Sequence, residues 1–147
     1  MAKELVHVLK FGRARQAAEC IGEAMLPMLG DLSGASLVVS YIPTATNRVR
    51  QRGYDQSALI ARHVARQLGL PFRPLLCRRG RQRQLGKNRS QRATQLASVF
   101  WTNKNLTNTE ILLIDDVITT GSSMHAAGRI LTQAGASRII TAAFAHA

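Results

Sequence analysis

Apolar residues occur along the chain in two patterns, short continuous runs and longer stripes with a helical period. The stripes predict helices at residues 3–29 (with a break near Gly12), 56–68, 90–99 and 122–134. The runs predict buried strands at residues 36–42, 72–77, 110–114 and 138–144. Strands that alternate with helices favour a parallel sheet. The predicted fold class is therefore α/β, a doubly wound, mainly parallel sheet with helices on both faces.

Two polar stretches interrupt this alternation. Residues 43–54 follow the first predicted strand and form a first basic loop. Residues 78–89 contain two glycines and only one apolar core candidate, Leu85, which predicts a surface loop.

Length and composition restrict the class of protein. With 147 residues and 46% hydrophobic residues, the chain is expected to form a single domain over residues 1–147 and is too apolar for a disordered protein. It has no apolar run of the ~20 residues that a membrane span needs, and its first residues do not form a secretory h-region, which predicts a cytoplasmic protein. Cys20 and Cys77 have neither zinc-site nor disulfide-framework spacing, and we expect both to be small buried residues.

The positive charge is concentrated in one part of the chain. Between Arg48 and Arg92 there are 13 basic residues and one acid, so this stretch carries the entire net charge of +12. Twelve of the 13 are arginines, whose planar guanidinium matches phosphate oxygens well. The pattern favours a polyanionic partner over a merely solubilising face. A small phosphorylated ligand and a nucleic acid both fit it.

The strongest chemical signal follows the apolar run at residues 111–114. Asp115 and Asp116 stand at its carboxyl end, where α/β folds bind ligands. The next helix opens with a segment that predicts a phosphate cradle, because helix N-termini present unpaired N–H groups. The cradle residues are Thr119, Thr120, Gly121, Ser122 and Ser123. Carboxylates beside a phosphate site suit sugar hydroxyls, or Mg²⁺ held through water, so the predicted ligand carries phosphate and ribose. The alternative is an ordinary strand–turn–helix with one acid as a cap.

Residues 115–123 resemble the phosphoribosyl-pyrophosphate (PRPP) motif of type I phosphoribosyltransferases. Three other segments, 9–12, 50–56 and 84–92 followed by Phe100, are similar to segments of the ComF/GntX family. They occur in the same order over nearly the whole chain. The chain is therefore identified as a member of the ComF/GntX family of type I phosphoribosyltransferase-like proteins.

The resemblance implies roles for the candidate residues. Asp115 and Asp116 would contact the ribose 2′- and 3′-hydroxyls, and residues 119–123 the 5′-phosphate. The implied pyrophosphate loop consists of Pro43, Thr44, Ala45, Thr46, Asn47 and Arg48. The implied flexible loop lies within residues 78–92 and includes Arg81, Arg83, Lys87 and Arg89. The implied cofactor is Mg²⁺ that enters with PRPP, without a direct protein ligand, and no catalytic residue is assigned.

The sequence departs from the family pattern in three places. We expect this protein to lack the cysteine-rich, zinc-binding stretch that in the family usually precedes the region corresponding to Lys3 onward, which leaves DNA binding without it open. Residues 44–47 replace a bulkier His-Pro-Arg type of sequence, and the basic side chain is displaced to Arg48. Thr119 stands where purine phosphoribosyltransferases often carry an acid, which argues against 6-oxopurine specificity.

Three functions are compatible with these observations. The first is a PRPP-binding, Mg²⁺-dependent phosphoribosyltransferase that transfers a ribosyl phosphate to an acceptor which the sequence does not name. By resemblance it is associated with DNA uptake in competence. The second is a competence accessory factor whose arginine-rich loops bind single-stranded DNA, and the third is a non-catalytic PRPP sensor. The sequence leaves catalysis and the oligomeric state open.

Overall fold

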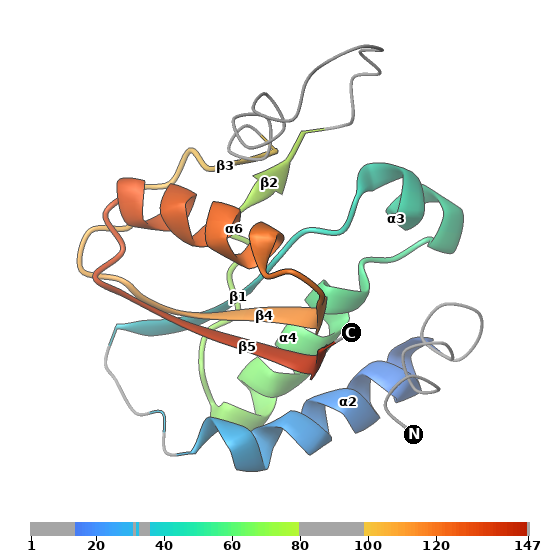
Figure 1. The fold of residues 1–147 in the computed structure, drawn as a ribbon. Helices are drawn as coiled ribbons and strands as arrows, with labels where there is room; N and C mark the ends of the chain where they lie inside the picture. The colour runs from blue at the N-terminus through green and yellow to red at the C-terminus, as the bar shows by residue number, and fades with distance from the viewer. Residues whose placement is uncertain (1–13, 31, 33–35, 80–98, 147) are drawn as a thin grey trace.

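The computed structural model describes residues 14–30, 32, 36–79 and 99–146, which form one layered α/β unit (Figure 1). The helices are α2 (Ala14–Leu29), α3 (Thr46–Arg52), α4 (Gln56–Leu68) and α6 (Ser122–Gln133). The strands are β1 (Leu37–Tyr41), β2 (Cys77–Arg78), β3 (Phe100–Trp101), β4 (Glu110–Ile118) and β5 (Arg138–His146). Among the described residues, no helix is both long and apolar enough to span a bilayer.

The main sheet is parallel and has the strand order β1-β4-β5. Leu37 pairs with Glu110 at one end of β1, and Tyr41 pairs with Ile114 at the other. Phe72 adds a parallel bridge to Val39 on the outer side of β1. The small strands β2 and β3 pair antiparallel in a separate sheet. The predicted doubly wound, mainly parallel fold is thus confirmed.

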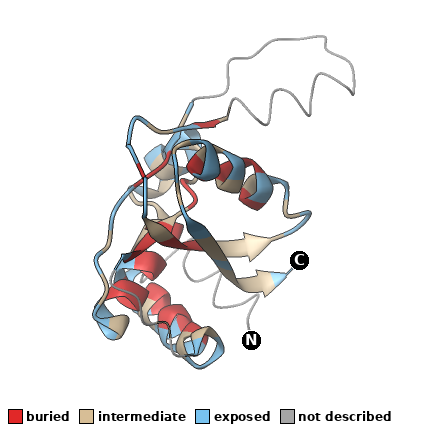
Figure 2. Cartoon of the chain, turned by 90° about the vertical axis from the view of Figure 1, so that its left-hand side faces the viewer, coloured by how far each residue is buried: buried red, intermediate tan, exposed pale blue. Residues whose placement is uncertain are grey.

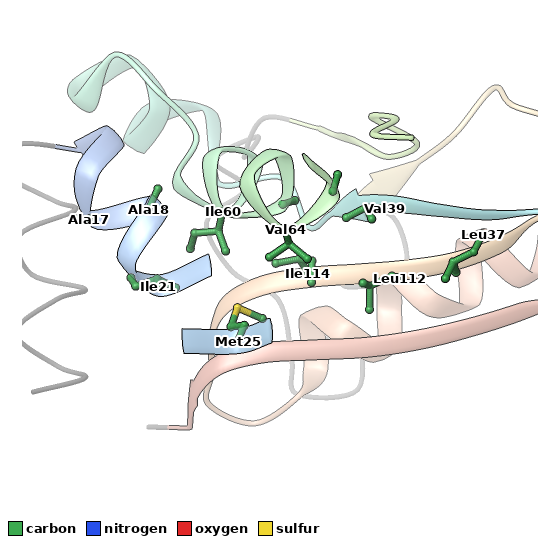
Figure 3. Packing of buried hydrophobic residues seen from close by; sticks show 12 residues of the cluster. Ala17, Ala18, Ile21, Met25, Leu37, Val39, Ile60, Val64, Leu112 and Ile114 are labelled. Carbon is green, nitrogen blue, oxygen red and sulfur yellow. The ribbon is translucent and has the colours of Figure 1, made fainter. Parts of the chain in front are cut away.

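Alternate residues of the central strands face two different helical layers. Leu37, Val39, Leu112 and Ile114 pack with α2 and α4, as the close view in Figure 3 shows. Val38, Ile111 and Leu113 pack on the other side of the sheet with α6. Both layers exclude water from the centre of the sheet, and Figure 2 shows buried residues on the central strands and on the helices that cover them.

Helices α2 and α4 lie in close contact on one face of the sheet. A Cβ atom at Gly22 would come within 2.6 Å of the His63 ring, so only glycine fits this crossing. His63 is 7% exposed, and its Nε2 lies 2.8 Å from Oε1 of Glu23. This packing holds α4 firmly against α2, which matters because α4 begins at the candidate site.

Several predicted elements are confirmed. The helices expected at 56–68 and 122–134 correspond to α4 and α6, and α2 supplies the described part of the helix expected at 3–29. The strands at 36–42 and 138–144 correspond to β1 and β5. The helix expected at 90–99 and most of the loop expected at 78–89 lie outside the described residues, as does the region before residue 14.

Other predictions were wrong in part. The first basic loop contains helix α3, because residues 46–52 include neither glycine nor proline, and Gly53 (φ 79°) ends the helix. The strand expected at 72–77 reduces to the Phe72 bridge and to β2, because Pro71 and Pro74 cannot donate ladder hydrogen bonds. The strand expected at 110–114 extends to Ile118, because β5 continues to pair with it as far as Ile118 and His146.

The two cysteines are both exposed, which contradicts the expectation that they are buried. Cys20 lies on the solvent side of α2, and Cys77 lies in the short strand β2. Their small size and apolar character are therefore not used in the core.

Candidate functional site

The connections after β1 and β4 diverge at the carboxyl edge of the sheet. The chain after β1 leads to α4 on one face, whereas the chain after β4 leads to α6 on the opposite face (Figure 1). Neighbouring parallel strands whose connections leave in this way form a crevice in which α/β proteins bind ligands. The amide of Ile42 donates to the carbonyl of Ile114 at 3.0 Å, which holds the two strand ends side by side.

Asp115 and Asp116 lie in β4 at this edge, and both are half-buried. Oδ1 of Asp115 accepts from the Ser57 hydroxyl at 3.1 Å and from the Asp116 amide at 2.9 Å. Burial, together with the neighbouring Asp116 carboxylate, raises the pKa of Asp115 to about 7. A carboxylate held in this way is well placed to accept hydrogen bonds from hydroxyl groups, and a bound ligand that donates them would favour its ionised form.

The start of α6 presents backbone amide groups to an anion, and of these the Ser122 amide has a long bond, at 3.4 Å, to the Thr120 hydroxyl. Gly121 takes the N-cap position with φ 73°, a left-handed conformation that favours glycine, and its position has no side-chain cap. The Thr120 and Ser122 hydroxyls lie 2.7 Å apart and are exposed, as is Thr119. Ser123 is half-buried in the first turn. An uncapped helix N-terminus surrounded by hydroxyls is suited to a phosphate group.

The segment after β1 is held by a side chain instead. Oδ2 of Asp55 accepts from the Thr44 amide at 2.9 Å, and Oδ1 accepts from the Thr44 hydroxyl at 3.0 Å. The Arg78 guanidinium donates to the Pro43 carbonyl at 3.1 Å. Pro43 is buried and Ala45 half-buried, whereas residues 46–48, in the first turn of α3, are exposed. The implied pyrophosphate loop is therefore a short constrained turn that leads directly into a helix.

The surroundings of this edge are basic. Of the eight arginines between Arg48 and Arg79, three lie on α3 and Arg78 contacts the turn at Pro43, whereas Arg66 lies in the last turn of α4, away from this edge. Arg48 and Arg50 are exposed on α3. Arg52 donates from Nη1 to Oε1 of Gln56 at 2.6 Å, which ties α3 to the start of α4. A positive field of this kind attracts a polyphosphate.

The residues present suit Mg²⁺ that arrives on a ligand. The described part of the chain has no group of three or more His, Cys, Asp or Glu side chains that could hold a metal ion by itself. Mg²⁺ binds through one or two carboxylates together with substrate phosphates and water. Asp115 and Asp116 can supply such contacts only in combination with ligand oxygens.

The structure brings together three of the predicted sets, namely the two acids, residues 119–123 and the turn at 43–48. It does not describe Arg81, Arg83, Lys87 and Arg89, so their predicted role stays a prediction. Sequence reasoning missed Asp55 and Ser57, which connect these sets. A carboxylate directly before a helix indicates a cap for α4, but nothing in the sequence indicates the contacts across 11 and 58 residues.

Comparison with known proteins is consistent with this geometry. The family of the phosphoribosyl transferase domain matches residues 55–147, which include the start of α4, both acids and the start of α6. The chain belongs to the phosphoribosyl transferase domain family. The resemblance noted in the sequence is thus confirmed at the level of the family.

Two curated relatives of this phosphoribosyl transferase domain carry names connected with DNA. The chain is 31% identical over 94 residues to competence protein ComFC of Bacillus subtilis, covering 64% of this chain and 38% of that protein. It is 28% identical over 143 residues to DNA utilization protein YhgH of Salmonella typhimurium, covering 92% of this chain and 63% of that protein. The chain therefore spans less than two thirds of the length of these relatives.

Solved structures support the fold. The glutamine PRPP amidotransferase of B. subtilis superimposes with a TM-score of 0.63 at 16% identity, over 90% of this chain and 27% of that one. An adenine phosphoribosyltransferase superimposes with a TM-score of 0.53 at 17% identity, over 90% of this chain and 69% of that one. The phosphoribosyl transferase domain of this chain thus has the type I fold.

Proposed function

We propose that this protein binds PRPP together with Mg²⁺ at the carboxyl edge of β1 and β4. The 5′-phosphate would lie on the amides and hydroxyls of residues 119–123, and the ribose hydroxyls would bind Asp115 and Asp116. The pyrophosphate would lie against the turn at residues 43–48. The observation that carries the proposal is the uncapped start of α6, with Gly121 in a left-handed conformation, directly after two half-buried acids.

The same arrangement would support transfer of a ribosyl phosphate to an acceptor. Departure of pyrophosphate leaves positive charge on the ribose carbon and negative charge on the leaving group. Mg²⁺, when bound, neutralises the leaving pyrophosphate. The arginines of α3 would add positive charge near the leaving pyrophosphate. The two acids would orient the ribose by hydrogen bonds to its hydroxyls.

Calorimetric titration with PRPP and Mg²⁺ tests this proposal directly. We expect saturable binding that weakens when EDTA removes the metal, and separate, weaker binding of ribose 5-phosphate and of pyrophosphate with Mg²⁺. Absence of PRPP binding by the folded protein would refute the proposal. Release of pyrophosphate during incubation with candidate nucleophiles would identify an enzyme, whereas binding without release would identify a sensor.

Single-stranded DNA is a second candidate ligand, because exposed arginines are concentrated within one stretch of the chain. Arg48, Arg50, Arg66, Arg73 and Arg79 are all exposed. The relatives named above are a competence protein and a DNA utilization protein, which supports a role in handling DNA.

Salt dependence tests the DNA proposal. The logarithm of the binding constant should fall linearly with the logarithm of salt concentration, by about 0.7 for each neutralised single-strand phosphate. Replacing Arg48 and Arg50 by Gln should reduce that slope, whereas the matched change of Arg15 and Arg129, exposed arginines outside the basic stretch, should not. DNA binding that is absent at low salt, in a protein that binds PRPP, would refute this second role.

A further inference from the structure

Three consecutive residues at the start of α4 each contact a different part of the candidate site. Asp55 accepts two hydrogen bonds from Thr44, Gln56 accepts one from Arg52 of α3, and Ser57 donates one to Asp115 of β4. We propose that Asp55 and Ser57 are positioning residues, through which the first turn of α4 aligns the turn after β1 with the acids of β4. This inference rests on the proposed function, because it assigns these two residues roles in binding the two halves of that ligand.

The contacts of Asp55 exceed what a helix cap requires. A cap needs one hydrogen bond from the side chain to the first turn, and the bond from the Ala58 amide is the longest of the three, at 3.4 Å. The bonds from Thr44 are shorter, at 2.9 and 3.0 Å, and engage both carboxylate oxygens. Since one residue supplies both donors, Asp55 fixes the position of Thr44 as well as the start of α4.

Ser57 acts on the acids in a similar way. It is 1% exposed, and a buried serine in a helix can satisfy its hydroxyl on its own backbone. Here the hydroxyl instead donates to Oδ1 of Asp115, 58 residues along the chain. The Asp116 amide donates to the same oxygen, so two donors hold the carboxyl group of Asp115 in one orientation.

The helix that carries these residues is well anchored. Ile60, Ala61, Val64 and Ala65 are buried in the cluster that α4 shares with α2 and the sheet. The turn at Thr44 is bonded to the start of this helix and is thereby connected to the buried core. The two halves of the proposed ligand site lie on different loops, and α4 holds both of them in place.

Ribose 5-phosphate tests the role of Ser57. We expect Ser57→Ala to weaken its binding about tenfold, as for a lost hydrogen bond to a charged group, while binding of pyrophosphate with Mg²⁺ stays unchanged. The matched control is Ser40→Ala, since Ser40 is also a buried serine, on β1, whose hydroxyl accepts from the Leu75 amide at 3.3 Å. In an Asp115→Asn background the additional effect of Ser57→Ala should shrink, because the charged acceptor is gone.

Pyrophosphate with Mg²⁺ tests the role of Asp55. We expect Asp55→Ala to weaken its binding several-fold, because the turn at Thr44 loses its support. Asp55→Asn should restore most of the binding, since the amide oxygen can accept from the Thr44 amide while the amide nitrogen donates to the Thr44 hydroxyl, and only the long bond from the Ala58 amide is lost. A variant that was merely less stable would lose binding of ribose 5-phosphate and of pyrophosphate alike. It would also show no recovery in Asp55→Asn.

The possible results separate the two proposals. If the wild-type protein binds PRPP and each variant weakens its own probe, the positioning roles stand. If the wild-type protein binds PRPP but both variants bind both probes normally, or weaken both probes equally, the positioning roles are overturned and the proposed function stands. A wild-type protein that binds none of the probes overturns both. If Ser57→Ala does not fold, Ser57→Cys replaces it, because cysteine is similar in size and keeps a weaker donor. The expected loss of ribose 5-phosphate binding is then smaller.

Discussion

The two connections at the carboxyl edge of the sheet are held in opposite ways. The turn after β1 is fixed by side chains, because Asp55 binds Thr44 twice and Arg78 binds the Pro43 carbonyl. The turn after β4 has few such contacts, and its backbone depends on Gly121 in a left-handed conformation at an uncapped helix start. The start of α3 at Ala45 also lacks a side-chain cap, so the two connections differ in the turn before the helix: side chains fix the first turn, and the second depends on its backbone. The following changes test that difference.

The largest effect is expected at the acids. Asp115→Asn combined with Asp116→Asn should weaken PRPP binding by about 2–6 kcal/mol, since each lost hydrogen bond to a charged group accounts for about 1–3 kcal/mol. Calorimetry with a folded double variant measures the loss. Unchanged affinity in that variant would remove the acids from the ligand site.

Asp115 should also lower the free energy of unfolding at high pH. Because the folded-state pKa of Asp115 is raised from 3.8 to about 7, the folded protein binds a proton that the unfolded chain releases between these values. The folded state is therefore stabilised by the proton on Asp115. This stabilisation is complete below about pH 3.8 and is lost as the pH rises through about 7. Asp115→Asn should therefore raise the free energy of unfolding at pH 8, on the order of 1–3 kcal/mol, and less at pH 5. Urea unfolding at the two pH values checks this, and an equal effect at both would contradict it.

Gly121 should be sensitive to the addition of a single methyl group. Gly121→Ala places a side chain at φ 73° and should lower the free energy of unfolding by about 1–2 kcal/mol. Gly128→Ala, in the middle of α6 with nothing within 4 Å of its Cβ position, is the matched control and should raise it by about 0.5–1 kcal/mol. Thermal unfolding of the two variants compares them, and losses of similar size would argue against strain at Gly121.

The smallest effect is expected at Thr44. Thr44→Val removes the hydroxyl that lies 3.0 Å from Oδ1 of Asp55 but keeps the backbone amide bond at 2.9 Å. The free energy of unfolding should fall by about 0.5–1.5 kcal/mol, the usual contribution of one hydrogen bond. Chemical unfolding at pH 7 measures it. A loss much greater than this range would show that the turn after β1 depends on the hydroxyl more than on the amide.

Local patterns allowed much of the fold to be predicted, but not the contacts between distant segments. The stripe of apolar residues and Gly69 define α4 almost completely, because period and stop signal are both local. The extension of β4 to Ile118 depends on pairing with β5, and the helix at 46–52 has no apolar face to reveal it. The acids and the start of α6 were visible as a contiguous motif. Asp55 and Ser57 were missed because their partners lie far away along the chain.

The distance along the chain between Ser57 and Asp115 also bears on how the protein folds. Parallel pairing of β1 with β4 must close a long loop before it gains any stability, which makes such contacts late and slow events in folding. The proposed ligand site therefore depends on these long-range contacts, so that only the folded chain would bind PRPP. A ligand at 100 times its dissociation constant would stabilise the native chain by about 2.7 kcal/mol. In a cell, abundance of the ligand would then regulate how much of this protein survives proteolysis, in addition to whether its site is occupied.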